Sequence, residues 1–246
     1  MSQSGTRACN CCGTTLHSQE FTRVQWARGK DFSTCINCVK GVSSSSFSFG
    51  RMTPPRRKVP ITRVSVNIEN IFAEGSFKYC TEGIYIGGSR AGEECVAKWF
   101  KEDNDFDAEY FARDLDAIDQ SANIIAMWNK EGIVPGVKIR LNIPEIWHIG
   151  ERRCMIEPYI EGFTKFNSNT GWIKRGVRVE LLRILNALSH YSYHVTSGQH
   201  LICDLQGGVH GDVLTLTNPA VLSRRQKFGP ADLGPKGMSN FFYHHR

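Results

Sequence analysis

The chain has 246 residues, of which 41% are hydrophobic, and it carries a formal net charge of +6. This length is sufficient for one large globular domain, or for a medium domain with a small one. No run reaches the roughly 18 consecutive apolar residues of a membrane helix, and the first residues, MSQSGTRACN, lack the pattern of a signal peptide. We therefore expect a cytoplasmic or nuclear protein without a membrane contact.

The first part of the chain is rich in cysteine. Two CxxC pairs, Cys9 with Cys12 and Cys35 with Cys38, are separated by 22 residues. Each pair can place two thiolates on one tight turn, and two such turns complete a tetrahedral zinc shell. This predicts a zinc-binding module over residues 1–40, in which Cys11 is an alternative ligand to Cys9 or Cys12. Its layout resembles small LIM-like or Stc1-like zinc modules, which implies protein docking.

The positive charge is concentrated at the same end. Residues 1–60 contain nine Lys and Arg against two Asp and Glu, or +7, whereas the remainder has 21 against 22, or −1. Such asymmetry is typical of a contact with a partner protein or a nucleic acid, although a solvated tail has the same composition. Residues 41–60, rich in Ser, Pro and Arg, are predicted to be a linker.

The rest of the chain mixes strand and helix patterns. Three β-favouring runs, 62–68, 77–87 and 94–100, are separated by turns that contain glycine and predict an antiparallel meander. Apolar residues then recur at helical spacing, in a helix that Gly132 ends and that we expect to pack on the meander. The residues of this stripe are Phe111, Leu115, Ile118, Ala122 and Ile125.

Later segments continue the alternation. The runs 137–143, 145–149 and 154–160 have strand character, and 177–193 carries a second apolar helical face. A further strand, HLICDL, follows at 200–205. Together these patterns predict an α+β fold.

Seven stretches carry a family resemblance. From Val64 onward they resemble the atypical alpha-kinases, in the order found in that family, while the HRD, DFG and APE signatures of conventional protein kinases are absent. The resemblance implies a two-lobed kinase-like fold over residues 61–246, with ATP in its cleft. It also implies transfer of the ATP γ-phosphate to a Ser or Thr hydroxyl of a protein substrate. The stretches are FAEGSFKYC, CVAKWF, MIEPYIEGFTKFNSNTGW, ALSHYSYHVTSG, HLICDLQGG, LTLTNP and FGPADLGPKGMSNFF.

The resemblance assigns nucleotide-binding roles to the first of these stretches. Lys98 would hold the α-phosphate, and Lys78, after the glycine turn, would be a further phosphate contact. Glu157 and the backbone near Tyr159 would recognise adenine. Alone, a strand lysine such as Lys98 is more often a solvated surface residue, so the assignment depends on the combination.

The later stretches receive the catalytic roles. Asp204 would orient or deprotonate the substrate hydroxyl, Gln206 would bind magnesium, and Lys165 and Asn169 would line the catalytic cleft. This set suits phosphoryl transfer, which depends mainly on positioning and on charges near the transferred phosphate.

The glycine-rich segment FGPADLGPKG matches a family loop close to the nucleotide. By the resemblance, Gly229, Asp232, Gly234 and Gly237 lie near the site. Out of that context the same segment predicts an ordinary surface loop.

Asn218 departs from the family pattern. Relatives read Leu-Thr-Asp-Pro where this chain has LTNP, so an amide replaces a carboxylate that ligates magnesium. An amide oxygen can bind the metal without contributing charge, and weaker binding is expected. This leaves open a pseudokinase or ATP-binding scaffold, and also a protein- or nucleic-acid-binding role that lies mainly in the zinc module.

A second departure concerns zinc in the larger lobe. The family builds that site from a helix histidine, matched by His190, and from a His-x-Cys segment whose histidine matches His245. The sequence stops at Arg246, before the first matching cysteine. We therefore expect a domain that is C-terminally truncated relative to the family, with a partial zinc site.

Overall fold

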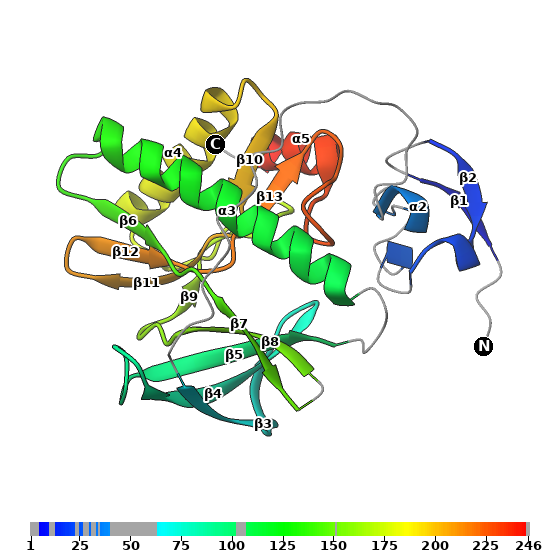
Figure 1. The fold of residues 1–246 in the computed structure, drawn as a ribbon. Coiled ribbons are helices and arrows are strands. Elements are labelled where there is room, and N and C mark those ends of the chain that lie inside the picture. The colour runs from blue at the N-terminus through cyan, green and yellow to red at the C-terminus, as the bar shows by residue number, and fades with distance from the viewer. Residues whose placement is uncertain are drawn as a thin grey trace. The chain divides into compact units, whose positions relative to one another are not determined.

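The structure is a computed structural model, in which the chain divides into two units (Figure 1). The structure describes residues 5–9, 13–22, 25–26, 30, 33, 35–39, 63–101, 107–150 and 152–244. Unit 1 comprises Met1–Ser43, Ala108–Leu141 and Gly162–Arg246, and unit 2 comprises Ser44–Asp107 and Asn142–Glu161. Each unit has its own sheet structure and its own apolar core. The predicted boundaries at 40 and 60 remain predictions.

Unit 2 is built on a five-stranded sheet in which every neighbouring pair is antiparallel. The strand order β3-β4-β5-β8-β7 confirms the predicted meander of the first three strands. The bounds are β3 Arg63–Glu74, β4 Lys78–Gly87, β5 Glu94–Phe100, β7 Glu145–Ile149 and β8 Arg152–Pro158.

Strand β3 is longer than predicted because it contains an irregularity. Its pairing with β4 shifts register between Val66 and Ile71. The buried Thr81 hydroxyl of β4 lies 2.8 Å from the carbonyl oxygen of Asn67 and 2.7 Å from that of Asn70. The hydroxyl can donate to either of these carbonyl groups where the ladder is interrupted, and β3 continues to the turn at Gly75.

The two faces of this sheet have different roles. Tyr85, Ala97, Trp99 and Ile156 belong to the apolar cluster on one face. Because side chains alternate along a strand, Lys98 in β5 lies on the opposite face. The core therefore fixes the strands, and the opposite face carries Lys98 together with the apolar side chains of Val96 and Met155.

From residue 108 onward, the described part of unit 1 combines the helices α3, α4 and α5 with two small sheets. One sheet has the order β6-β12-β11-β9, with only the β6–β12 pair parallel, and the other is the antiparallel pair β10–β13. Among the described helices, none has the length and apolar content needed to cross a membrane. The bounds are α3 Asp107–Glu131, β6 Lys138–Leu141, β9 Thr164–Lys165, α4 Val179–Val195, β10 His200–Cys203, β11 Gln206–His210, β12 Val213–Leu216, β13 Ala220–Ser223 and α5 Gly234–His244.

The core of unit 1 includes part of the buried face of α3. Its residues Ile124, Ile125 and Trp128 join a cluster with Leu185 of α4 and Ile202 of β10, while the packing of α3 on the meander stays a prediction. The spacing of apolar residues predicted the helix and its buried face, but periodicity does not specify which element covers that face. The predicted end of the helix is confirmed, since Gly132 follows it with a φ of 62°.

An asparagine ties α3 to the neighbouring strand. The Asn129 Nδ2 donates to the Ile139 carbonyl oxygen at 2.7 Å, and its Oδ1 accepts the Ile139 N–H at 3.0 Å. Both main-chain groups of this β6 residue are thereby satisfied by one side chain of α3.

The described N-terminal residues form a small cluster of their own. Strand β1 (Thr6–Ala8) pairs antiparallel with β2 (Thr15–His17), followed by the 3-10 turn η1 (Ser18–Glu20) and, further on, α2 (Ile36–Val39). Arg7 stacks on Trp26, with its guanidinium carbon 3.6 Å from the ring centroid, and donates to the Ser33 hydroxyl at 2.7 Å.

His200 gives the stability of unit 1 a dependence on pH. Burial lowers the pKa of His200 to about 4, and the Lys227 charge acts in the same direction. The unfolded chain keeps a pKa near 6.5, so it binds more protons than the native state between these values. Stability is therefore full above pH 6.5 and falls as the pH drops towards 4, by ~1–3 kcal/mol.

The measurement is denaturant unfolding of the wild type and His200→Gln over this pH range. The variant should show a shallower loss of unfolding free energy on acidification, because other titrating groups contribute equally to both proteins. Identical slopes would contradict the assignment to His200.

Candidate active site

In unit 2, the structure brings together the predicted residues Lys98 and Glu157. Strands β5 and β8 pair antiparallel, with Val96 opposite Glu157 and Lys98 opposite Met155, so the two charged side chains lie diagonally on one face. They form an ion pair, and their side chains are only 12% and 5% exposed. Removing one partner from such a pair leaves a buried charge without compensation.

Two further residues of β4 belong to this face. Lys78 lies opposite Phe100, and its Nζ is 3.9 Å from the Met155 sulfur. Cys80 lies opposite Lys98, where burial raises the pKa of its thiol while the Lys98 charge opposes the rise. The sequence analysis assigned a role to Lys78 but none to Cys80. Because side chains alternate between the two faces of a strand, Cys80 could have been predicted to share the face of Lys78, two residues earlier.

Tyr159 follows β8, and its side chain is 40% exposed. Its backbone N–H donates to the Glu94 carbonyl oxygen at 3.0 Å. By the resemblance, the main chain near Tyr159 would recognise adenine. The Tyr159 N–H, one of its two main-chain groups, is already hydrogen-bonded to Glu94.

In unit 1, Asp204 and Asn218 lie at the same end of the β10–β13 pair. Cys203 is opposite Ala220 in this antiparallel pair, so the chain leaves β10 at Asp204 close to where it approaches β13 through Asn218. Both residues are left-handed, with φ values of 55° and 49°. Asp and Asn adopt this conformation more readily than most non-glycine residues.

Strand β9 brings Lys165 to the same place. Lys165 is opposite Gln206 across the β9–β11 pair, and its Nζ lies 2.6 Å from Asp204 Oδ1. The ammonium approaches outside the directions of a good hydrogen bond, and the two side chains are 46% and 20% exposed. The Gln206 carbonyl oxygen accepts the N–H of Thr217 at 3.0 Å, which ties β11 to the segment that carries Asn218.

Asn169 has a different position from the other predicted site residues. Its Nδ2 donates to the Ala231 carbonyl oxygen at 2.8 Å. In this structure it therefore connects the KFNSN segment to the glycine-rich loop.

Asp232, which the resemblance places near the site, is held by hydrogen bonds within its own loop. Its side chain is 0% exposed. Oδ1 accepts the N–H groups of Ser223 and Gly234 at 2.8 and 2.9 Å, while Oδ2 accepts the Ser223 hydroxyl at 2.6 Å and the Phe228 N–H at 3.2 Å. Burial raises the pKa of Asp232, and these four donors oppose the rise. The carboxylate thus organises its own loop.

The glycines of this segment differ from the expectation of an open loop. Gly234 begins α5 and Gly237 lies inside it, and both are buried. A Cβ on Gly237 would lie 2.5 Å from Leu233 Cβ and 3.0 Å from Leu222 Cδ1, so glycine is required there by close packing. Gly229 has a φ of 76° and forms a turn before Asp232.

The end of β10 offers oxygen ligands for a divalent cation. Asp204 supplies a carboxylate, and Gln206 and Asn218 supply amide oxygens, which are ligands that suit Mg²⁺. Within the described residues no group of three or more His, Cys, Asp and Glu side chains could hold a metal.

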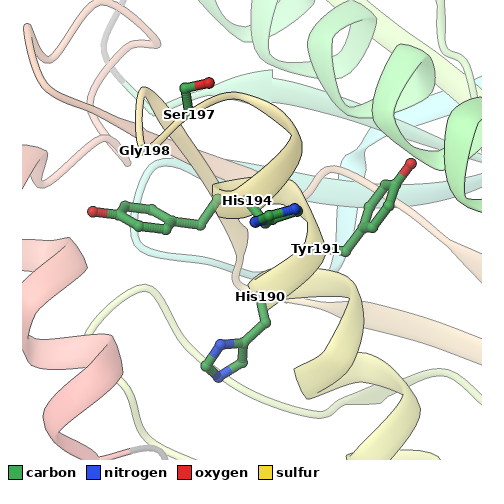
Figure 2. A pocket seen from close by; sticks show the side chains of 6 residues that line it. His190, Tyr191, His194, Ser197 and Gly198 are labelled. Atoms are coloured by element: carbon green, nitrogen blue, oxygen red, sulfur yellow. The ribbon is translucent and has the colours of Figure 1, made fainter.

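The predicted zinc position in the larger lobe is only partly described. The His190 ring packs near Phe242 and Phe241, with centroid distances of 5.2 and 6.1 Å, while His245 lies outside the described residues. A pocket of about 530 Å³ lies around the last turns of α4, as Figure 2 shows. Among the predicted site residues only His190 lines it; the lining is His190, Tyr191, Tyr193, His194, Ser197 and Gly198.

At the N-terminus, the structure brings Cys9 and Cys35 together. Both are buried, and the Cys35 N–H donates to the Cys9 sulfur at 3.2 Å. The N–H of Gly13 donates to the Cys9 carbonyl oxygen at 2.8 Å. Cys12 and the side chain of Cys38 lie outside the described residues.

Comparison with known proteins defines the class of this chain. Residues 73–246 match the alpha-kinase family profile. This region is more than half of the chain, so the protein belongs to the alpha-kinase family.

Three relatives illustrate the match. Alpha-protein kinase vwkA of Dictyostelium discoideum is 36% identical over 93 residues, covering 37% of this chain and 14% of that protein. Alpha-protein kinase 1 of the same organism is 30% identical over 181 residues, covering 71% of this chain and 13% of that protein. The solved alpha-kinase domain of myosin heavy chain kinase A, in complex with ADP, has a TM-score of 0.62 and 21% identity, covering 75% of this chain and 85% of that one. The chain thus has the alpha-kinase fold and spans about one seventh of the two curated relatives.

The Asp232 network predicts a large loss of stability on truncation. Asp232→Ala would leave main-chain and hydroxyl donors buried without an acceptor, so the free energy of unfolding should fall by about 3 kcal/mol. Denaturant unfolding measures this change. Asp212→Ala is the matched control, because Asp212 is exposed and its removal should cost less than about 0.5 kcal/mol. Equal effects of the two substitutions would contradict the structural role.

Proposed function

We propose that this protein is an alpha-type protein kinase, which transfers the γ-phosphate of ATP to a Ser or Thr hydroxyl of a protein substrate. Family membership supports the reaction class. The observation that carries the proposal is the gathering of Asp204, Lys165, Gln206 and Asn218 around one end of the β10–β13 pair. Acidic, cationic and amide groups are the parts that phosphoryl transfer needs.

In this proposal, the nucleotide binds to the face of the unit 2 sheet that carries Lys78, Lys98 and Glu157. Lys98 and Lys78 place positive charge at the phosphates. Glu157 takes part in adenine binding and also holds the Lys98 ammonium in position, since the two side chains form a buried ion pair. The carbonyl group of Tyr159 is the main-chain group that remains for adenine after its N–H bonds to Glu94.

Asp204 acts on the protein substrate. Its carboxylate orients the substrate hydroxyl and accepts the proton as the hydroxyl oxygen bonds to the γ-phosphorus, while the bond from that phosphorus to the β–γ bridging oxygen breaks and ADP leaves. The Lys165 ammonium, 2.6 Å from Asp204 Oδ1, is placed to stabilise negative charge on the transferred group.

Gln206 and Asn218 would hold Mg²⁺, which neutralises phosphate charge when bound. Because Asn218 contributes an amide and no charge, the metal affinity should be lower than with aspartate. This substitution is also the observation that favours a second candidate, an ATP-binding scaffold with impaired turnover.

The kinase proposal predicts that Lys98→Ala and Asp204→Ala each lower transfer of radiolabelled phosphate from ATP by at least about a hundredfold. Autophosphorylation or a general acceptor protein provides the readout. Asp212→Ala, an exposed carboxylate outside the proposed site, should retain wild-type transfer. If both site variants keep their activity, the proposed site is wrong.

Asn218→Asp separates the kinase from the scaffold. It should raise transfer at limiting magnesium, because a second carboxylate strengthens metal binding. Thermal stabilisation by ATP without transfer, in both the wild type and Asn218→Asp, would instead favour a scaffold whose loss of turnover has another cause.

We also propose that the N-terminal residues Cys9, Cys12, Cys35 and Cys38 bind a structural zinc. The bond from the Cys35 N–H to the Cys9 sulfur and the burial of both residues support this proposal, since backbone hydrogen bonds to the sulfur stabilise a thiolate ligand. By contrast, His190 alone carries no proposal for zinc in the larger lobe.

The zinc proposal predicts about one equivalent of zinc in the purified protein by elemental analysis. Cys9→Ser and Cys35→Ser should each lose it, because three thiolates no longer close the tetrahedral shell. Cys203→Ser, a buried cysteine in β10, is the control and should keep its zinc. Retention of zinc by both N-terminal variants would refute the site.

A further inference from the structure

Leu205, the residue between Asp204 and Gln206, is held by hydrogen bonds on both of its main-chain groups. Its side chain is 0% exposed and belongs to the core of unit 1. Its N–H donates to Asn167 Oδ1 at 2.6 Å. Its carbonyl oxygen accepts the N–H groups of Phe166 and Asn167 at 2.9 and 3.3 Å. One short segment therefore fixes the peptide groups on both sides of Leu205.

Asn167 is well placed to keep this arrangement rigid. Its side chain is 2% exposed, and its backbone forms an isolated bridge with Ile173. It lies two residues after Lys165, the residue that pairs with Asp204. The segment that carries the Lys165 charge thus also holds the backbone beside the Asp204 carboxylate.

The hydrogen bond to Asn167 acts on a strained conformation. Asp204 has a φ of 55°, and non-glycine residues keep such a backbone only where their surroundings enforce it. The Leu205 N–H belongs to the peptide plane that begins at the Asp204 carbonyl carbon, so fixing its direction fixes the ψ angle of Asp204. Without the Asn167 acceptor, this N–H would be buried without a partner, which favours rotation of the plane.

We propose that Asn167 is a positioning residue for phosphoryl transfer, which acts by holding the left-handed turn at Asp204. This inference rests on the proposed kinase function. It assigns Asn167 to the catalytic step and not to nucleotide binding, because its side chain bonds to the backbone that orients Asp204. Asn167 should therefore influence kcat and leave the KM for ATP unchanged.

The experiment compares Asn167→Ala with Asn129→Ala in the full chain. Asn129 makes two bonds to the main chain of Ile139, so its removal is a comparable loss of a half-buried, hydrogen-bonded asparagine in the same unit, at a position outside the proposed site. Both variants should be less stable. Only Asn167→Ala should lower kcat, by at least tenfold, with the KM for ATP within twofold of the wild type.

Two further readouts separate positioning from general destabilisation. Hydrogen exchange of the Leu205 amide should become faster in Asn167→Ala and stay slow in Asn129→Ala. Asn167→Asp keeps an acceptor oxygen in the same position, so it should restore the protection of this amide and recover part of kcat.

The outcomes distinguish this inference from the kinase proposal. Full kcat in Asn167→Ala, or an equal fall of kcat in Asn129→Ala, overturns the positioning role while leaving the kinase proposal intact. If the wild type transfers no more phosphate than Asp204→Ala, the kinase proposal fails and the inference falls with it.

Discussion

The left-handed turn at Asp204 is the constraint on which the rest of unit 1 depends. Strand β10 belongs to the two-stranded sheet and β11 to the four-stranded sheet, so the chain passes from one sheet to the other at this residue. It returns before β13 through Asn218, which is also left-handed. The polar side chains of the candidate site thus gather where the two sheets exchange strands, and the apolar residues that flank the turn anchor it in the core.

Each unit contains one ion pair of predicted site residues, and the two pairs differ in burial in a way that suits different tasks. The side chains of Lys98 and Glu157 are almost completely buried, and each contributes to the compensation of the other's charge. Lys165 and Asp204 are partly exposed, and an exposed pair contributes little to stability. The first pair is therefore suited to keep a lysine in a fixed position, whereas the second can exchange its partner for a phosphate group or a substrate hydroxyl at small cost.

Much of the fold could be predicted from the sequence, because alternation and helical spacing are local signals. The strands at 94–100 and 145–149 have the predicted bounds. Helix α5 was missed because Gly234, Pro235 and Gly237 disfavour a helix locally, while the need for close packing at Gly237 comes from tertiary structure. The resemblance found Asp204 but not Asn167, because the role proposed for Asn167 depends on a hydrogen bond to Leu205, which is 38 positions away in the sequence. The partner of the basic N-terminal segment and the cellular location remain predictions.

The Asp204 carboxylate, held by this turn, is the group on which the proposed phosphoryl transfer depends. Asp204→Asn tests it most directly, because asparagine tolerates the left-handed backbone and removes only the charge. A single-turnover measurement of phosphate transfer, with circular dichroism and thermal unfolding on the same samples, gives the answer. We expect an unchanged fold and a loss of transfer of at least about a hundredfold. Transfer at the wild-type rate by a correctly folded Asp204→Asn protein would contradict it.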